Sequence, residues 1–206
     1  MMMYINIRRS LGVRWFRLAN RNRFAKFGRN VYVFEDVEFS MTKLIELGSD
    51  VVVQRHCYLA AASDTDGSRG SSLVIGDGSN IGVRNHVFAQ GNVIIGKKVL
   101  TAPNVFISDC THVFTDPVMP IMDQGIKLLA PTSIGDNSWI GHGSTIIGCK
   151  VGKHCVVGAN SVVLSDVPDY SVVAGAPARI VKQFDPSRQV WIAVERPGDH
   201  SEPELP

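Results

Sequence analysis

The sequence lacks the features that mark several specialised classes of protein. Its 206 residues contain no run near the ~18 apolar residues needed to span a bilayer. The N-terminus has no apolar core followed by a small-residue cleavage site, the pattern of a secretory signal. The 4 cysteines show no Cys-x-x-Cys spacing, and we interpret them as free thiols in a reducing compartment. We therefore expect a cytoplasmic globular protein.

Net charge is also scarce, although it is unevenly distributed. The formal net charge is only +2, yet residues 1–34 contain no acidic residue. Their basic residues, interleaved with aromatics, are Arg8, Arg9, Arg14, Arg17, Arg21, Arg23, Lys26 and Arg29. Such a stretch can lie on an anionic membrane or meet nucleic acid. We favour a short helix within residues 1–30, packed on the end of the main body. We expect no nucleic-acid partner, and peripheral membrane contact stays open.

The most informative pattern is a repeat of six residues. It is marked by pairs of an aliphatic residue and a glycine, at Leu47-Gly48, Ile75-Gly76, Ile81-Gly82, Ile95-Gly96, Ile134-Gly135, Ile140-Gly141, Val151-Gly152 and Val157-Gly158. A helix would repeat at three and four residues and a simple strand at two. Hexapeptide repeats predict a parallel β-helix, in which three short strands close one triangular coil. The aliphatic residues would point to the axis, and Gly, Asn and Asp would relieve the corners by adopting positive φ.

Interruptions of the repeat divide the chain. We predict the β-helix over 31–182, with protruding loops at 60–72 and 108–133. Val93 and Ile95 lie two residues apart, which suggests a register correction at a corner. Residues 183–206 have few apolar side chains, so we expect a partly disordered tail.

The loop over 108–133 holds the candidate chemistry. Loops that protrude from a rigid body often carry function. A neutral imidazole such as that of His112 can accept a proton from an attacking hydroxyl near neutral pH. Asp109, Asp116 or a backbone carbonyl would serve to orient its ring. On the residues alone, a structural role for His112 is the alternative.

Four motifs resemble those of the hexapeptide acetyltransferases. They are Ala102-Pro-Asn-Val-Phe-Ile-Ser-Asp-Cys-Thr-His112, Ile134-Gly-Asp-Asn-Ser-Trp-Ile-Gly141, Val157-Gly-Ala-Asn-Ser-Val-Val163 and Val173-Ala-Gly-Ala-Pro-Ala-Arg179. Within that family, the chain is similar to galactoside and maltose O-acetyltransferases and to acetyltransferases of polysaccharide biosynthesis. The resemblance covers roughly residues 30–182. It implies an all-β fold, a left-handed parallel β-helix, whose handedness the spacing does not determine.

The resemblance also implies an activity. Such an enzyme transfers an acetyl group from acetyl-CoA to a sugar hydroxyl, directly and within a ternary complex, with His112 as general base. The acceptor would be a sugar, a nucleotide sugar or a lipid-linked sugar. Asn85, Asp109 and Asp116 would lie at the acceptor. A homotrimer with each active site between two neighbours is implied as well.

A coenzyme path along the C-terminal coils follows from the same resemblance. The residues expected along it are Trp139, Gly141, His142, Ala159, Arg179 and Lys182. Arg179 and Lys182 would meet phosphates, which a guanidinium can bind bidentately. Trp139 either covers a corner or stacks against the coenzyme.

Three other functions are alternatives to this one. A γ-class carbonic anhydrase uses the same scaffold, but no histidine pair here has the spacing of its zinc site, and we expect no metal. An N-acetyltransferase acting on an amino sugar nucleotide is compatible with every motif. A non-catalytic scaffold would use the long loop for contacts between subunits, and it would neither bind coenzyme A nor depend on His112.

Overall fold

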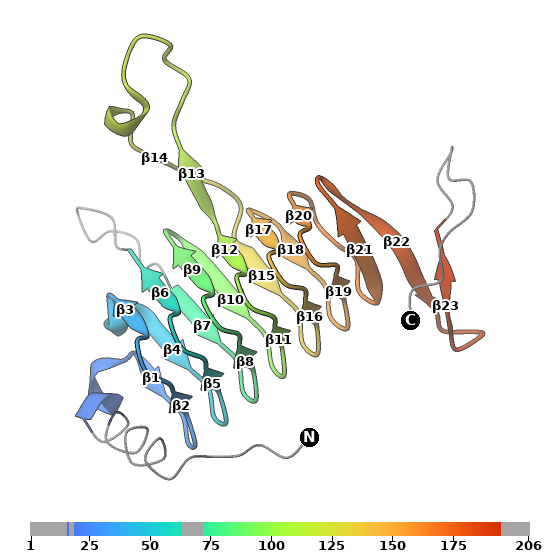
Figure 1. Ribbon diagram of the computed structural model, residues 1–206, viewed down its shortest axis with the longest axis horizontal. Helices are drawn as coiled ribbons and strands as arrows, with labels where there is room; N and C mark the ends of the chain where they lie inside the picture. The colour runs from blue at the N-terminus through green and yellow to red at the C-terminus, as the bar shows by residue number, and fades with distance from the viewer. Residues whose placement is uncertain (1–15, 17–18, 63–71, 195–206) are drawn as a thin grey trace.

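The chain folds into successive triangular coils of short parallel strands (Figure 1). The computed structural model describes residues 16, 19–62 and 72–194. The first face of the prism consists of β1 (Lys26–Phe27), β4 (Ile45–Leu47), β7 (Ser72–Ile75), β10 (Asn92–Ile95), β15 (Thr132–Ile134) and β18 (Lys150–Val151). The second face begins with β2 (Tyr32–Val33), β5 (Val52–Val53), β8 (Asn80–Ile81), β11 (Leu100–Thr101), β16 (Trp139–Ile140) and β19 (Val156–Val157).

The second face ends with three longer strands, β21 (Ser171–Gly175), β22 (Ala178–Asp185) and β23 (Val190–Ala193). The third face contains β3 (Glu38–Ser40), β6 (Tyr58–Ala61), β9 (His86–Ala89), β12 (Phe106–Ser108), β17 (Thr145–Ile147) and β20 (Val162–Val163). Outside the faces lie β13 (Cys110–His112), β14 (Ile126–Leu128) and the 3₁₀ turns η1 (Arg21–Arg23), η2 (Thr42–Leu44) and η3 (Ile121–Asp123).

The hexapeptide residues stack in register, which explains their spacing. On the second face Val53 pairs with Ile81, and on the third face Ile107 lies between Val87 and Ile146. All of these side chains are fully buried. Burial of each aliphatic side chain is worth roughly 1.5–3 kcal/mol. These stacks of inward-pointing aliphatic residues, which we call the columns, are therefore the main source of stability.

The apparent register correction at Val93 and Ile95 is not present. Both residues lie on β10 and both point inward, as the alternating burial along the strand shows. Val93 pairs with Leu73, and Ile95 pairs with Ile75. The central strands of the first face, such as β7 and β10, are long enough to place two side chains in the core, whereas second-face strands such as β8 place one.

The glycine of nearly every repeat is required by the distance between coils rather than by positive φ. A Cβ on Gly76 would lie 2.6 Å from the carbonyl carbon of Gly96 in the next coil. Positive φ occurs instead at corner residues two positions later, such as Gly78 and Asn137. The expectation that Asn relieves corners is confirmed, whereas the role given to the repeat glycine is corrected.

Both ends of the prism differ from the predicted boundaries. Helical geometry occurs at Phe16, Ala19 and Asn20, and most of the segment predicted to be helical lies outside the described residues. β1 already pairs with β4, so the parallel strands begin before residue 31. The ring of Phe24 packs edge-on against Phe39 at 5.0 Å between centroids and closes the first coil.

The C-terminal segment returns onto the prism. β22 runs antiparallel to β21, and β23 then pairs with β22. Residues 183–185 and 190–193, predicted to belong to a tail, therefore lie in strands joined by a turn, and residues 195–206 lie outside the described part. The loop predicted at 60–72 starts later, because β6 extends to Ala61. Among the described residues, no helix is long and apolar enough to cross a membrane.

Candidate active site

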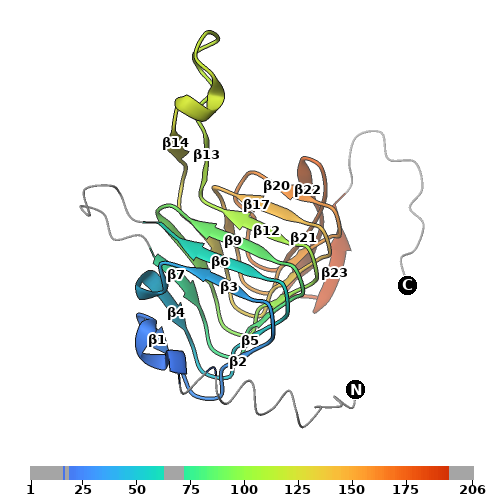
Figure 2. The same ribbon diagram turned by 60° about the vertical axis from the view of Figure 1, so that its left-hand side comes forward.

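A two-stranded arm projects from the body between β12 and β15 (Figures 1 and 2). β13 and β14 pair antiparallel, with Cys110 opposite Leu128 and His112 opposite Ile126. The Val113 amide donates to the carbonyl of Gly125 at 3.0 Å and extends the ladder. The predicted loop at 108–133 is therefore a hydrogen-bonded arm, and we refer to residues 109–131 by that name.

Asp116 organises the tip of the arm. Its Oδ1 accepts the amides of Val118 at 2.8 Å and Met119 at 3.1 Å. These two hydrogen bonds hold the pKa of the Asp116 carboxyl below its usual value. The side chain of Gln124 donates to the carbonyls of Asp116 and Met119, both at 2.8 Å. Asp116 therefore acts as a local turn former, and no hydrogen bond in the described chain joins it to His112.

His112 is exposed on β13, close to the body. Within the described residues its ring has no hydrogen-bond partner, so the structure shows no group that orients it. Asp109, the other predicted partner, is fully buried. Its two carboxylate oxygens accept the amides of Gln90 and Gly91, each at 2.8 Å. The prediction that Asp109 or Asp116 orients His112 is not supported by these contacts.

Asn85 is an internal residue of the coil. Its side chain is 1% exposed. The amide oxygen accepts the Val105 N–H at 2.9 Å, and the amide nitrogen donates to the hydroxyl of Thr101. Because these bonds join successive coils, the structure corrects the expectation that Asn85 contacts the acceptor. The same holds for buried Asp109.

The structure brings together three of the residues predicted along the coenzyme. Gly141, His142 and Ala159 follow the second-face strands β16 and β19 at the edge leading to the third face. A Cβ on Gly141 would lie 2.7 Å from the amide nitrogen of Ala159, so the two coils are in close contact. The imidazole of His142 is exposed, with its Nε2 3.5 Å from Nδ2 of Asn104. We call this line of corners the coenzyme edge.

Arg179 continues the coenzyme edge, and Lys182 lies farther along the same strand. Arg179 pairs across the hairpin with Ala174, directly after Val173, whose carbonyl accepts the amide of Gly158. Within the part of the chain that the structure describes, its exposed guanidinium donates only to the carbonyl of Ala178, at 2.9 Å. Lys182 lies opposite Val172, near the beginning of β21.

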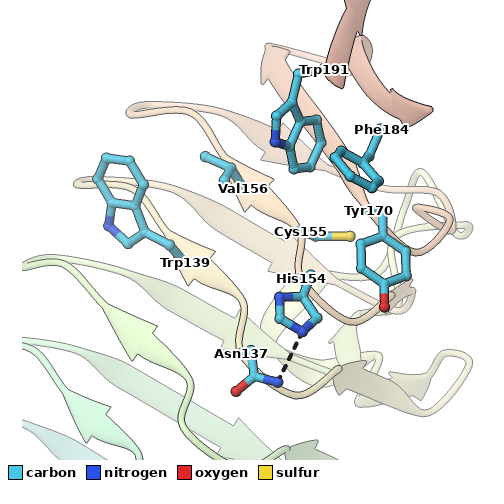
Figure 3. Close-up of a pocket in the computed structure, with 8 residues that line it drawn as sticks. All are labelled: Asn137, Trp139, His154, Cys155, Val156, Tyr170, Phe184 and Trp191. Atoms are coloured by element: carbon cyan, nitrogen blue, oxygen red, sulfur yellow. Dashed lines mark hydrogen bonds between the residues drawn. The ribbon is translucent and has the colours of Figure 1, made fainter. Parts of the chain in front are cut away.

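Trp139 borders an aromatic hollow of about 370 Å³ on the second face (Figure 3). The ring of His154 stacks on Tyr170 with centroids 5.2 Å apart, and Phe184 contacts Trp191 edge-on at 5.5 Å. Trp139 itself is 50% exposed. Sequence reasoning missed this hollow because Phe184 and Trp191 reach it only through the antiparallel return of β22 and β23. The hexapeptide spacing carries no signal for that return.

The thiols and carboxylates near the arm do not form a second catalytic group. Burial raises the pKa of the Cys110 thiol, which keeps it protonated and poorly nucleophilic. In the described part of the chain, no three or more His, Cys, Asp or Glu residues gather as a possible metal site.

His112 and the coenzyme edge lie at different edges of the prism. The coenzyme edge precedes the third face, whereas His112 lies on the arm that follows third-face strand β12. One chain therefore presents His112 and the residues predicted to bind the coenzyme on opposite sides of the third face.

Comparisons with known proteins show similarity to acetyltransferases. Residues 131–165 match the model of the hexapeptide repeat of succinyl-transferase. The chain is 39% identical over 112 residues to a probable acetyltransferase of Mycobacterium tuberculosis, covering 54% of this chain and 37% of that protein. It is 34% identical over 113 residues to a putative lipopolysaccharide biosynthesis O-acetyl transferase of Escherichia coli, covering 52% and 58%. The galactoside O-acetyltransferase of Escherichia coli is 36% identical over 118 residues, covering 52% and 56%. The chain thus spans only part of each relative.

Solved structures share the fold. An N-acyltransferase from Bacillus cereus, AntD, in complex with dTDP and 3-hydroxybutyryl-CoA, superposes with a TM-score of 0.69 at 18% identity, over 84% of this chain and 89% of that chain. A maltose O-acetyltransferase from Clostridium difficile gives a TM-score of 0.53 at 26% identity, over 86% of each chain. The predicted left-handed parallel β-helix and the resemblance to hexapeptide acetyltransferases are confirmed.

Proposed function

We propose that this chain is an acetyl-CoA-dependent O-acetyltransferase that acts on a hydroxyl of a sugar or polysaccharide precursor. The observation that carries the proposal is an exposed imidazole, His112, held on a hydrogen-bonded arm that leaves a rigid coil. The relatives named as O-acetyltransferases of galactosides and lipopolysaccharide support a sugar hydroxyl as acceptor.

The chemistry assigned to His112 is general-base catalysis. The acceptor hydroxyl gives its proton to the neutral imidazole while its oxygen bonds to the thioester carbonyl carbon. The carbon–sulfur bond then breaks, and the coenzyme A thiolate receives the proton from the imidazolium. No covalent acyl-enzyme forms in this ternary complex. Such proton transfer is typically worth about 10² to 10⁴ in rate.

A homotrimer would complete the site. His112 and the coenzyme edge lie on opposite sides of the third face, so a base from one chain and a coenzyme from its neighbour can meet between two prisms. The exposed apolar side chains of the arm support a protein partner. Phe114, Val118 and Met122 are 69%, 90% and 84% exposed, although apolar patches of this kind are usually covered.

The coenzyme is proposed to lie along the coenzyme edge. Backbone groups at Gly141 and Ala159 would line it, and the guanidinium of Arg179 would bind phosphate. Trp139 is two residues before Gly141, roughly 7 Å along an extended strand, so the aromatic hollow lies within reach of the same ligand. Lys182 is farther along β22 and would contribute long-range charge.

The amine of an amino sugar nucleotide is the second candidate acceptor. The same fold serves an N-acyltransferase whose structures hold dTDP-4-amino-4,6-dideoxyglucose and coenzyme A. An amine needs less assistance from a base than a hydroxyl does. The two candidates therefore differ in their dependence on His112.

The test is release of free coenzyme A from acetyl-CoA in the presence of sugars, nucleotide sugars and amino sugars. We expect release with one class of hydroxyl acceptor and at least about a hundredfold lower turnover in His112→Asn. His56→Asn is the matched control, since His56 is an exposed corner residue with φ of 58°, which Asn tolerates. Release that requires an amino sugar would favour N-acetylation. If the protein neither releases coenzyme A nor binds acetyl-CoA, the result would favour a non-catalytic scaffold.

A further inference from the structure

Asp109 joins the base of the arm to the preceding coil. It is the single residue between β12 and β13, and its carboxylate is fully buried. Each oxygen accepts one backbone amide at 2.8 Å, from Gln90 and Gly91, which directly follow β9. The carboxylate therefore fixes the chain at the point where it leaves the prism, three residues before His112.

The same residue also holds the returning strand of the arm. The Asp109 carbonyl accepts the amide of Leu129 at 2.8 Å, directly after β14. Leu128 packs over Gly91, where a Cβ would lie 2.9 Å from Leu128 Cδ1 and 3.1 Å from Asp109 Oδ2. Both strands of the arm are thus attached to one turn of the coil below. We call Gln90, Gly91, Asp109, Leu128 and Leu129 the arm root.

The contacts of Asp109 depend on its being a carboxylate. Its two oxygens face two N–H donors, and within the described residues no Lys or Arg forms an ion pair with it. Hydrogen bonds to an ionised acceptor are about twice as strong as neutral ones. An asparagine would present an NH₂ group to one of these donors, and a buried donor without an acceptor is costly. The two backbone hydrogen bonds therefore favour aspartate over asparagine, although the two side chains have nearly the same size.

We propose that Asp109 is a positioning residue that sets the direction in which the arm leaves the prism and so places His112. This inference rests on the proposed function and assigns Asp109 a role other than contact with the acceptor. Because the arm is long and attached at one end, a small rotation at the arm root displaces His112 and everything beyond it. A displacement of about 1 Å in a catalytic group can cost about 10²-fold in rate.

The experiment combines steady-state kinetics of Asp109→Asn, His112→Asn and the double variant with hydrogen exchange. We expect Asp109→Asn to lower kcat at least about tenfold while KM for acetyl-CoA changes less than about twofold. In the His112→Asn background the same change should have no further effect on kcat, because the group that it positions is gone. Amides of β13 and β14 should exchange faster in Asp109→Asn.

Asp77→Asn is the matched control. Asp77 Oδ1 accepts the amide of Ser49 at 2.7 Å on a corner away from the arm, so this variant makes the same chemical change where the remaining amide oxygen can still accept the single donor, and it does not touch the arm root. Asp77→Asn should have the kcat of the wild type and the same rate of amide hydrogen exchange in β13. If Asp109→Asn does not fold, Gly91→Ala disturbs the same root from the other side, through the contact with Leu128.

Each outcome bears on one of the two proposals. Unchanged kcat and unchanged exchange in Asp109→Asn would overturn the positioning role. An equal loss of kcat in wild type and in His112→Asn would also overturn it, since the effect would then not pass through His112. Full turnover in His112→Asn would contradict only the assignment of His112 as the base. Faster hydrogen exchange of β13 in Asp109→Asn would still show that Asp109 holds the arm root.

Discussion

His112 differs from the other predicted site residues Asp109 and Asn85 in how far its side chain is buried. His112 is exposed and without a partner in the described chain, as a residue that meets a substrate should be. Asp109 and Asn85 are buried, and their side chains are occupied by backbone amides of neighbouring coils. Residue type and position in the loop pointed to His112 and Asp109, and the family resemblance pointed to Asn85, but only the packing distinguishes the exposed imidazole from the side chains that hold the coils.

Asp116 gives a pH prediction for the tip of the arm. Its pKa is lowered by the hydrogen bonds from Val118 and Met119. A depressed carboxyl pKa stabilises the tip above the ordinary aspartate value of about 3.9, and this stabilisation is lost as pH falls through the lower folded value. We expect Asp116→Ala to speed exchange of the Val118 and Met119 amides at neutral pH. Asp116→Asn, which keeps an acceptor oxygen, should change it little. Equal exchange in both variants would contradict this role.

The four thiols should differ in reactivity. Burial raises the pKa of Cys57 and of Cys149 to about 11, and both side chains are 1% exposed. At pH 8 almost none of either thiol is ionised. Cys110 is half-buried, so a thiol reagent should label it first in the native protein, and slowly because its pKa is also raised. Mass spectrometry of the labelled peptides measures this order. Early labelling of Cys57 or Cys149 would show that the coils open more readily than their packing indicates.

At the scale of elements, the columns carry the stability, and the arm is the element to which we assign the function. Ile140 is fully buried on β16, whereas Leu100 on neighbouring β11 is 48% exposed. Ile140→Ala should lower the free energy of unfolding by about 2–5 kcal/mol through the cavity that it leaves. Leu100→Ala should change it by less than about 0.5 kcal/mol. Denaturant titration of both variants measures the difference, and equal effects would contradict the stacked core.

The exposed apolar residues of the arm give a prediction about trimer assembly. Val118 and Met122 lie near its tip and are almost fully exposed. A charged side chain at these positions would be expensive to bury against a second copy. We expect Val118→Asp with Met122→Asp to shift the protein from trimer to monomer in light scattering, with unchanged strand content by circular dichroism. A concentration-independent monomer in the wild type would contradict the trimer itself.

The hexapeptide spacing made the elements predictable, but not all of their boundaries. Aliphatic residues such as Ile81 and Ile107 could be assigned to the core because the side chain at that position of each six-residue unit must point to the axis of the prism. The two inward positions of β10 were misread, because strand length on each face depends on the shape of the triangle. The C-terminal return of β22 and β23 follows no repeat, so it and the aromatic hollow of Phe184 and Trp191 could not be foreseen.

At the scale of the whole molecule, the prism separates what a transfer reaction must bring together. The coenzyme edge and the arm lie on opposite sides of the third face, and each is rigidly attached to it. A rigid prism does not bend to close that gap. In the proposed trimer a neighbouring prism would close it without deformation, so the proposed site requires an oligomer for activity and not only for stability.

The most direct test of this claim is complementation between two inactive variants. His112→Asn lacks the base, and Arg179→Glu reverses the charge proposed to bind coenzyme phosphate; each alone should release little coenzyme A. Co-expressed with different tags and purified as mixed trimers, they should regain a substantial fraction of wild-type turnover. Some interfaces would then pair an intact His112 with an intact coenzyme edge from the next chain. Mixed trimers as inactive as either parent would show that both parts must come from one chain, which would contradict the shared site.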